Sequence, residues 1–340
     1  MAAAWRLSAG TVAVGVAVAA IASTATPPRE PGRVVRGLLP LIVGNPGDVQ
    51  RATRPALVLA GGGPDVDAAM AFFGAAAGAG DLVVLRATGG GGYNQYLFGL
   101  TGADSVETLL VASRQRAEDP YVLARVNQAE GVFLAGGDQA QYVNFWGGTS
   151  LAHAIDAVAG RGAPVGGTSA GLAVLGEWAF AALEGTVTSG QALANPYDGR
   201  ITLVRNMVRL PPLAGVITDS HFAARDRMGR LVTFLARIAS DWGVEEVRGI
   251  GIDEATALTV DEHGAARVAG RGAVYFLRIP GPPERCQPGQ PLTYRHIAVQ
   301  RATAGQVFDL PAWQGSGLLS YTVSAEDGVL TSTQVGGSIY

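Results

Sequence analysis

Short, continuous apolar runs alternate with helical patterns through the first three quarters of the chain. The apolar runs that predict buried strands lie at residues 56–60, 82–85, 106–111, 131–135, 163–166, 215–218 and 247–252. Apolar residues recur at helical spacing at 65–77, 139–145 and 150–158, and Asp119-Pro120 opens another predicted helix. Continuous apolar strands separated by helices are typical of a parallel sheet that is covered on both faces. The pattern therefore predicts an α/β fold.

The pattern changes character from about residue 256. Short strand-like segments at 257–260, 265–268 and 273–277, with a turn at 261–264, are typical of antiparallel hairpins. Strands and turns continue from residue 292 to the end of the sequence. We therefore expect an α/β domain at residues 35–280 and a β-rich C-terminal extension at residues 281–340.

The N-terminal residues have the pattern of a secretory signal. Arg6 is a lone positive charge, residues 7–22 are almost wholly apolar or small, and Ala20-Ile21-Ala22 offers an A-x-A cleavage site. The apolar run is shorter than the roughly 20 residues of a membrane span. We expect a signal peptide at residues 1–25, a linker at 26–34 and a secreted or periplasmic protein. An uncleaved anchor is the alternative. Glycines and charges interrupt every later apolar run, so we expect no membrane span there.

Composition excludes several kinds of chemistry. All 25 basic residues among the 340 are arginine, so a lysine-dependent phosphate loop, Schiff base or general base is excluded. The net charge of −3 does not favour nucleic acid as a partner. The single cysteine, Cys286, excludes an intrachain disulfide and a cysteine zinc site. No metal-ligand spacing is evident, and Gly89–Gly92 lacks the following helix that a dinucleotide fingerprint requires. We expect no metal and no cofactor.

The sharpest local signal is Gly167-x-Ser169-x-Gly171, which stands between a predicted strand and a helical run. This is the pattern of a nucleophile elbow, whose tight turn lifts the serine hydroxyl above the sheet. The N–H of Ala170, at the start of the following helix, would then face developing negative charge. The alternative interpretation is a turn of small residues that packs a helix on a strand.

A serine nucleophile needs a base, and His221 has the matching position. It follows the predicted strand 215–218, and Ser169 also follows a strand, at the edge of a parallel sheet where ligands bind. The other histidines are expected to be structural or solvated: His153 in a helix, His263 in a turn and His296 in a late strand.

An acid should orient the imidazole, and Asp253 and Glu254 lie at the end of the predicted strand 247–252. Strand alternation points their side chains in opposite directions, so only one of them is expected to reach His221. The residues alone do not choose between them. The order Ser, His, acid differs from the Ser, acid, His order of α/β-hydrolases, which disfavours a lipase or esterase of that fold.

Two further segments complete the candidate site. A glycine N–H of Gly136-Gly137 is a candidate second oxyanion donor, although this segment also fits a plain turn capped by Asp138. Arg227 and Arg230 share a helix face close to His221. Guanidinium groups bind carboxylates bidentately, so these arginines are candidates for binding a substrate carboxylate. The alternative interpretation is that they lie on a solvated helix face.

Four motifs, in this order, resemble those of the cyanophycinase family and, more distantly, of peptidase E, the α-aspartyl dipeptidase. They are Gly136-Gly137-Asp138-Gln139, Gly167-Thr168-Ser169-Ala170-Gly171, Asp219-x-His221-Phe222 followed by Arg225-x-Arg227-x-x-Gly229-Arg230-Leu231, and Gly249-Ile250-Gly251-Ile252-Asp253-Glu254. The resemblance covers roughly residues 55–280. It implies a flavodoxin-like, mostly parallel sheet with helices on both faces, related to class I glutamine amidotransferases but with serine in place of cysteine.

The resemblance also implies a function. Cyanophycinases are serine exopeptidases that release β-aspartyl-arginine dipeptides from cyanophycin, a polyaspartate with arginine branches. By motif, Ser169 would be the nucleophile, His221 the base and Glu254 the orienting acid, with Gly137 and Ala170 as oxyanion donors. The substrate pocket would comprise Asp138, Gln139, Asp219, Ser220, Arg225, Arg227 and Arg230. Homodimers are usual in the family, so a homodimer is expected.

One position departs from the family pattern. Ser220 stands where cyanophycinases commonly have glutamine, which changes a pocket wall. Other aspartyl or isoaspartyl peptides are therefore alternative substrates. An exported binding protein that keeps the fold without catalysis is the alternative from a different class.

Overall fold

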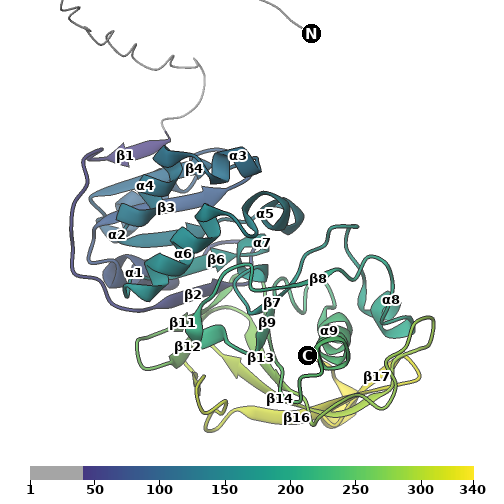
Figure 1. Cartoon of the computed structure of the whole chain (residues 1–340). Coiled ribbons are helices and arrows are strands. Elements are labelled where there is room, and N and C mark those ends of the chain that lie inside the picture. Colours follow the sequence, from purple (N-terminus) through teal and green to yellow (C-terminus); the bar gives the residue numbers. More distant parts are fainter. Residues whose placement is uncertain (1–40) are drawn as a thin grey trace, which may run out of the picture. The chain divides into compact units, whose positions relative to one another are not determined.

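The computed structural model describes residues 41–340 (Figure 1). The predicted signal peptide at 1–25 and linker at 26–34 lie outside these residues. The described strands form two sheets, which meet where the strand β10 (Arg248–Ile252) of one continues through a short turn into β11 (Thr256–Val260) of the other.

The first sheet has the strand order β1-β4-β3-β5-β6-β2-β11-β12-β15. Its remaining strands are β1 (Ile42–Gly44), β2 (Leu57–Ala60), β3 (Asp81–Arg86), β4 (Ser105–Leu110), β5 (Gly131–Leu134), β6 (Val165–Thr168), β12 (Ala265–Gly270) and β15 (Val307–Asp309). Strands β4, β3, β5, β6 and β2 are parallel, and antiparallel strands flank them on both sides. Five of the seven predicted strands thus form a parallel block in this sheet.

Helices cover both faces of this block because its strands are apolar on both sides. In β2, Val58 and Ala60 face one apolar cluster, whereas Leu57 and Leu59 face the other. The first cluster includes α1 (Asp67–Ala76) and α2 (Asn94–Thr101). The second includes residues of α3 (Arg114–Ala117), α4 (Pro120–Gln128), α5 (Gln139–Trp146), α6 (Ser150–Gly160) and α7 (Ala170–Ala173).

The second sheet has the order β17-β16-β14-β13-β10-β9-β7-β8. Its other strands are β7 (Trp178–Phe180), β8 (Leu203–Arg205), β9 (Val216–Asp219), β13 (Ala273–Arg278), β14 (Tyr294–Thr303), β16 (Leu319–Glu326) and β17 (Val329–Ser332). The amphipathic helix α9 (Met228–Trp242) packs its apolar residues into the cluster of this sheet, beside α8 (Ser189–Ala194). Two short 3₁₀ turns, η1 (Pro211–Leu213) and η2 (Val335–Gly337), complete the described elements.

The α/β class and the additional C-terminal strands agree with the sequence-based prediction. The arrangement differs in that the parallel strands are divided: β7, β9 and β10 lie in the second sheet and the other five in the first. Residues 281–340 add β14, β16 and β17 to the second sheet and β15 to the first. The extension is therefore built onto both sheets.

Three local expectations were wrong. The helix α2 begins two residues after the glycine run 89–92, so the absence of a following helix is no argument against a dinucleotide loop there. His153 lies in a helix, α6, as expected, but its side chain is exposed, which does not fit the expected structural role. The helical run after Ser169 is a single turn, α7, so any helix-dipole contribution to the site is small.

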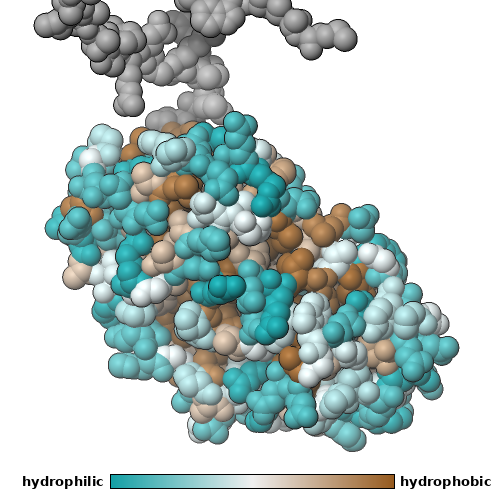
Figure 2. Space-filling model, in the orientation of Figure 1, coloured by the Kyte–Doolittle hydropathy of each residue, from teal (hydrophilic) through white to brown (hydrophobic). Residues whose placement is uncertain are grey.

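Within residues 41–340, no helix is long and apolar enough to cross a bilayer. The same part of the chain holds no group of three or more histidine, cysteine, aspartate or glutamate side chains suited to a metal ion. The face shown in Figure 2 is largely polar, with an apolar area close to β8.

Candidate active site

Ser169 occupies a strained turn between β6 and α7. Its φ of 53° and ψ of −115° lie outside the regions that ordinary residues favour, at a cost of roughly 1–3 kcal/mol. A Cβ on Gly167 would lie 2.7 Å from the backbone of Gly171, and one on Gly171 would lie 2.0 Å from the carbonyl oxygen of Leu134. Both glycines of the motif are therefore required by close backbone approach.

Ser169, His221 and Glu254 form one hydrogen-bonded chain. Ser169 Oγ lies 2.7 Å from His221 Nε2, and His221 Nδ1 lies 2.6 Å from Glu254 Oε1. Ser169 directly follows β6 in the first sheet. His221 lies two residues after the end of β9 in the second sheet, and Glu254 lies in the turn that joins β10 to β11. The three predicted residues thus meet where the two sheets join.

The segment after β2 ties these three loops together. The Ser169 N–H donates to the carbonyl of Ala60 at 3.1 Å, and the His221 N–H donates to that of Gly61 at 2.7 Å. The N–H of Ala255, next to the acid, donates to the carbonyl of Gly62 at 2.9 Å.

Gly62 also lies directly against the reactive pair. It has a φ of +91°, and a Cβ there would lie 2.5 Å from His221 Cε1 and Nε2. The run Gly61–Gly63 follows the predicted strand 56–60 and is not among the site residues expected from the sequence. The signal was present, because three consecutive glycines mark a place where backbone must approach other groups closely.

The geometry distinguishes between the two candidate acids. Asp253 accepts backbone N–H bonds from Ala223 and Ala273, each at 2.9 Å, through its two carboxylate oxygens. It therefore fixes the loop after His221 to β13. Glu254 contacts the imidazole itself, because the two residues lie in a turn rather than on the strand that the sequence suggested.

Gly136 lies beside Ser169, and Tyr142 orients the peptides of Gly136 and Gly137. A Cβ on Gly136 would be 3.4 Å from the Cβ of Ser169. The buried Tyr142 hydroxyl lies 2.8 Å from the Ala135 carbonyl oxygen and 3.2 Å from that of Gly136. In a trans peptide the N–H points opposite to the carbonyl, so the N–H of Gly137 points away from Tyr142. Tyr142 is not among the predicted site residues, because no local motif marks it.

The predicted arginines divide into buried and accessible groups. Arg230 is buried, and its guanidinium binds Asp219 through two hydrogen bonds of 2.7 and 2.5 Å, so it supports Asp219 rather than facing solvent. Burial opposes ionisation of Asp219, but Arg230 and Arg227 outweigh it and lower the pKa of that carboxyl. Arg227 Nη1 donates to the Ser220 carbonyl at 2.8 Å and lies 3.4 Å from the Ser220 hydroxyl.

Arg225 is the accessible member, with 53% of its side chain exposed, and its Nε lies 4.0 Å from Glu254 Oε1. Burial lowers the pKa of Arg227 to about 10, which leaves it charged at neutral pH. Asp138, which follows β5, caps α5 by accepting from the Ala140 N–H at 3.0 Å. Gln139 is the partly exposed first residue of that helix.

The local charges favour a neutral imidazole beside an ionised acid. Burial lowers the pKa of His221, and the positive charges of Arg225 and Arg227 lower it further, against the opposing effect of the hydrogen bond that Nδ1 donates to Glu254. The hydrogen bond to His221 lowers the pKa of Glu254. At neutral pH the pair is therefore imidazole and carboxylate, which is the state that can accept a proton from a serine hydroxyl.

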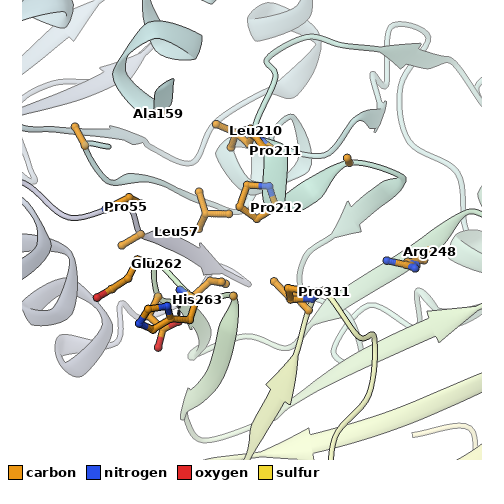
Figure 3. A pocket seen from close by; sticks show the side chains of 17 residues that line it. Pro55, Leu57, Ala159, Leu210, Pro211, Pro212, Arg248, Glu262, His263 and Pro311 are labelled. Carbon is orange, nitrogen blue, oxygen red and sulfur yellow. Dashed lines mark hydrogen bonds between the residues drawn. The ribbon is translucent and has the colours of Figure 1, made fainter. Parts of the chain in front are cut away.

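A separate apolar pocket lies at the other end of the parallel strands (Figure 3). It is lined by residues at the beginnings of β2 and β10 together with proline side chains, among them Pro55, Leu57, Pro211, Pro212, Arg248 and Pro311. Because Ser169 follows the opposite, carboxyl end of β6, this pocket is not part of the site around the serine.

Comparisons with known proteins find similar sequences among the cyanophycinases. A cyanophycinase of Synechococcus elongatus is 34% identical over 177 residues, which cover 52% of this chain and 50% of that protein. The chain thus matches about half the length of that relative. A cyanophycinase of Trichormus variabilis is 28% identical over 275 residues, covering 76% of this chain and 87% of that protein.

A solved peptidase from an acI-B1 actinobacterium shares the fold. Its TM-score is 0.51 at 19% identity, with 75% of this chain and 97% of that one covered. The model of peptidase family S51 matches residues 94–268, more than half of the 340 residues, and this range contains Ser169, His221 and Glu254. The chain belongs to peptidase family S51.

Proposed function

We propose that this protein is a serine exopeptidase that hydrolyses cyanophycin to β-Asp-Arg dipeptides. The observation that carries the proposal is the chain of short contacts from Ser169 Oγ to His221 Nε2 and from His221 Nδ1 to Glu254, in a member of family S51. The similarity to cyanophycinases supports the choice of substrate.

The reaction begins with the serine hydroxyl. Ser169 Oγ attacks the scissile carbonyl carbon while His221 Nε2 takes its proton. Glu254 holds the imidazole in the required tautomer and stabilises the imidazolium. The N–H groups of Ala170 and Gly137 stabilise the negative oxygen of the tetrahedral intermediate. His221 then gives the proton to the leaving amine, and the first product departs.

Water completes the cycle. His221 takes a proton from a water molecule, whose oxygen attacks the acyl carbon on Ser169. The ester bond breaks, and the proton returns from His221 to Ser169 Oγ. The second product leaves as a carboxylic acid, so the sum of both halves is hydrolysis of one amide bond.

Arg225 and Arg227 supply the positive charge for a substrate rich in carboxylates. In cyanophycin the aspartate side-chain carboxyls form amide bonds to arginine, so its charges are the α-carboxylates and the guanidinium groups of the arginine branches. Guanidinium groups of the protein bind carboxylates with strong, directional hydrogen bonds. Asp219 accepts hydrogen bonds from Arg227 Nη1 and from the Ser220 N–H, and Arg230 in turn binds Asp219. In this proposal Gln139 and Asp138 line the opposite side of the serine.

Incubation with insoluble cyanophycin, followed by mass spectrometry of the soluble products, tests the substrate assignment. We expect release of β-Asp-Arg by the wild type and none by Ser169→Ala. Absence of this product with folded wild-type protein would contradict cyanophycin as the substrate.

A second candidate is a peptidase of the same mechanism that acts on other aspartyl or isoaspartyl peptides. Ser220 favours it, because its small side chain leaves room in a wall where cyanophycinases commonly have glutamine. A panel of α-linked and β-linked aspartyl dipeptides distinguishes the two. Turnover of such dipeptides well above that of cyanophycin would favour this candidate.

Export and self-association complete the proposal. Residues 1–25 have the pattern of a secretory signal, so the enzyme would meet polymer released by other cells. Fractionation of expressing cells and N-terminal sequencing of the product test export, and light scattering tests the expected homodimer.

Replacing Gly62 by alanine is expected to lower kcat/KM on the order of 100-fold, the usual cost of displacing a catalytic group by about 1 Å. The added Cβ would lie 2.5 Å from the His221 ring, which must shift away from Ser169. The matched control is Gly305→Ala, which has a similar φ of +84° with open space around it. Both variants should lose some thermal stability, but only Gly62→Ala should lose activity. Full activity in Gly62→Ala would contradict the close packing described.

The acid limb of the pH profile of kcat/KM is expected below pH 6.5, the approximate ordinary pKa of histidine. Burial and the nearby arginines lower the pKa of His221, so the neutral, active form persists to lower pH. Arg225→Gln removes one positive charge and should move the limb to higher pH. Arg225→Lys keeps the charge and should leave it in place. A wild-type limb above pH 6.5, or identical limbs in all three proteins, would disprove this assignment.

A further inference from the structure

The helix α9 receives its N-terminal cap from the far end of the chain. The side chain of its own N-cap residue, Arg227, makes no capping hydrogen bond. Instead the N–H of Met228 donates to the hydroxyl of Tyr340 at 2.9 Å, and that hydroxyl donates to Asp226 Oδ1 at 2.8 Å. The first N–H groups of a helix have no partner within it, so this contact satisfies one of them. Figure 1 shows the C mark next to α9.

The ring of Tyr340 supports the residue that follows the catalytic histidine. It meets Phe222 edge to face with centroids 6.0 Å apart, and Tyr275 with centroids 5.8 Å apart. Phe222 is fully buried, and a Cβ on Gly251 would lie 2.6 Å from its ring. Phe222 therefore has backbone of β10 on one side and Tyr340 on another.

The loop from His221 to Met228 needs such support. His221 and Asp226 both have positive φ, at 47° and 48°, which side-chain-bearing residues adopt at a cost that surrounding contacts must offset. The same loop carries Arg225 and Arg227. Its backbone position therefore sets both the imidazole and the guanidinium groups of the site.

Tyr340 is itself held by the C-terminal extension. The hydroxyl of Tyr321 in β16 donates to the carbonyl of Ile339 at 2.9 Å. Ile339 and Tyr340 pack against the apolar cluster of the second sheet. Burial raises the pKa of the Tyr340 hydroxyl far above its usual range, so it stays protonated and able to donate to Asp226.

We propose that Tyr340 is a positioning residue for the active site: its ring and hydroxyl fix the loop of residues 221–228, so the C-terminal extension takes part in catalysis through this loop. The inference rests on the proposed function, because it assigns a role within that reaction. Tyr340 touches neither Ser169 nor the His221 ring in the contacts described, and acts through Phe222, Asp226 and Met228.

Two substitutions separate the contributions of the hydroxyl and the ring. Tyr340→Phe keeps the ring contacts and removes both hydrogen bonds, which loosens the start of α9 and Arg227. We expect KM to rise about fivefold with kcat nearly unchanged, which is at the lower end of what the loss of two hydrogen bonds can cost. Tyr340→Ala also frees Phe222, so kcat should fall as well, by about tenfold or more.

The matched control is Tyr294→Phe. Tyr294 belongs to the same extension, and its hydroxyl donates a 2.6 Å bond to the Gly281 carbonyl, outside the 221–228 loop. Its loss should lower the melting temperature without changing KM or kcat. A merely structural role for Tyr340 predicts that its Phe variant behaves like this control.

A second readout does not depend on cyanophycin. The rate at which a small serine-reactive phosphonate labels Ser169 reports the serine and histidine alone. We expect Tyr340→Phe to react at nearly the wild-type rate and Tyr340→Ala at least several-fold slower at a temperature where both are folded. If wild type is labelled but does not cleave cyanophycin, the substrate proposal fails and the labelling rates still test Tyr340. Wild-type labelling by Tyr340→Ala, or unchanged KM in Tyr340→Phe on any cleaved substrate, would overturn the inference.

Discussion

Replacing Ser169 by alanine is expected to lower the turnover of cyanophycin about 10⁶-fold, because the three residues act as a unit and none can replace the missing nucleophile. The hydroxyl is the only atom group removed, and alanine adopts the strained turn no less easily than serine does. The melting temperature should therefore stay within a few degrees of wild type. Release of β-Asp-Arg, measured by mass spectrometry over long incubations, gives the ratio of rates.

The size of the loss is informative as well as its direction. A residual rate within about tenfold of wild type would remove Ser169 from the role of nucleophile. An inactive wild type that still binds cyanophycin in a sedimentation assay would instead favour an exported binding protein. Equal activity in both proteins after repurification would point to a contaminating peptidase.

Replacing Glu254 by glutamine is expected to lower kcat about 10⁴-fold. Glutamine has nearly the same size, but its amide can donate to His221 Nδ1 and so stabilise the tautomer with a proton on Nε2. That tautomer cannot accept a proton from Ser169 Oγ, which lies 2.7 Å from Nε2 in the wild type. Because 40% of the Glu254 side chain is exposed, the free energy of unfolding should change little.

Asp253→Asn is the matched comparison on the neighbouring acid. Asp253 accepts two backbone N–H bonds, and an asparagine amide group would face one of these donors. We expect a loss of roughly 1–3 kcal/mol of stability and a much smaller loss of kcat than in Glu254→Gln. The reverse pattern, with activity lost in Asp253→Asn and kept in Glu254→Gln, would assign the orienting role to Asp253.

Local motifs made Ser169 predictable from the sequence. Gly167 and Gly171 flank it at fixed spacing, and both are needed because a Cβ at either position would clash with neighbouring backbone. The predicted position of His221 also rested on a local signal, the end of a buried strand. Each of these features depends on a few consecutive residues.

The choice between Asp253 and Glu254 was not accessible to the same reasoning. It depends on the turn between β10 and β11, where the chain passes from one sheet to the other. Apolar runs indicate that both segments are buried strands, but not that they belong to different sheets. Only the resemblance to cyanophycinase pointed to Glu254 in advance.

Contacts between segments that are distant in the sequence could likewise not be predicted from it. Gly62 approaches the His221 ring across 159 positions of sequence, and Tyr340 reaches Met228 across 112. The burial of Arg230 against Asp219 also needs the three-dimensional arrangement, because spacing on α9 alone equally suits an exposed arginine. The signal peptide at residues 1–25 stays a prediction.

Labelling with a serine-reactive phosphonate, followed by peptide mapping, tests the central claim most directly, because it requires no knowledge of the natural substrate. The account predicts one adduct, on Ser169, that forms in the wild type and forms at least 100-fold more slowly in His221→Gln. Folded wild-type protein that carries no adduct on Ser169, or that labels at the same rate with and without His221, would contradict it.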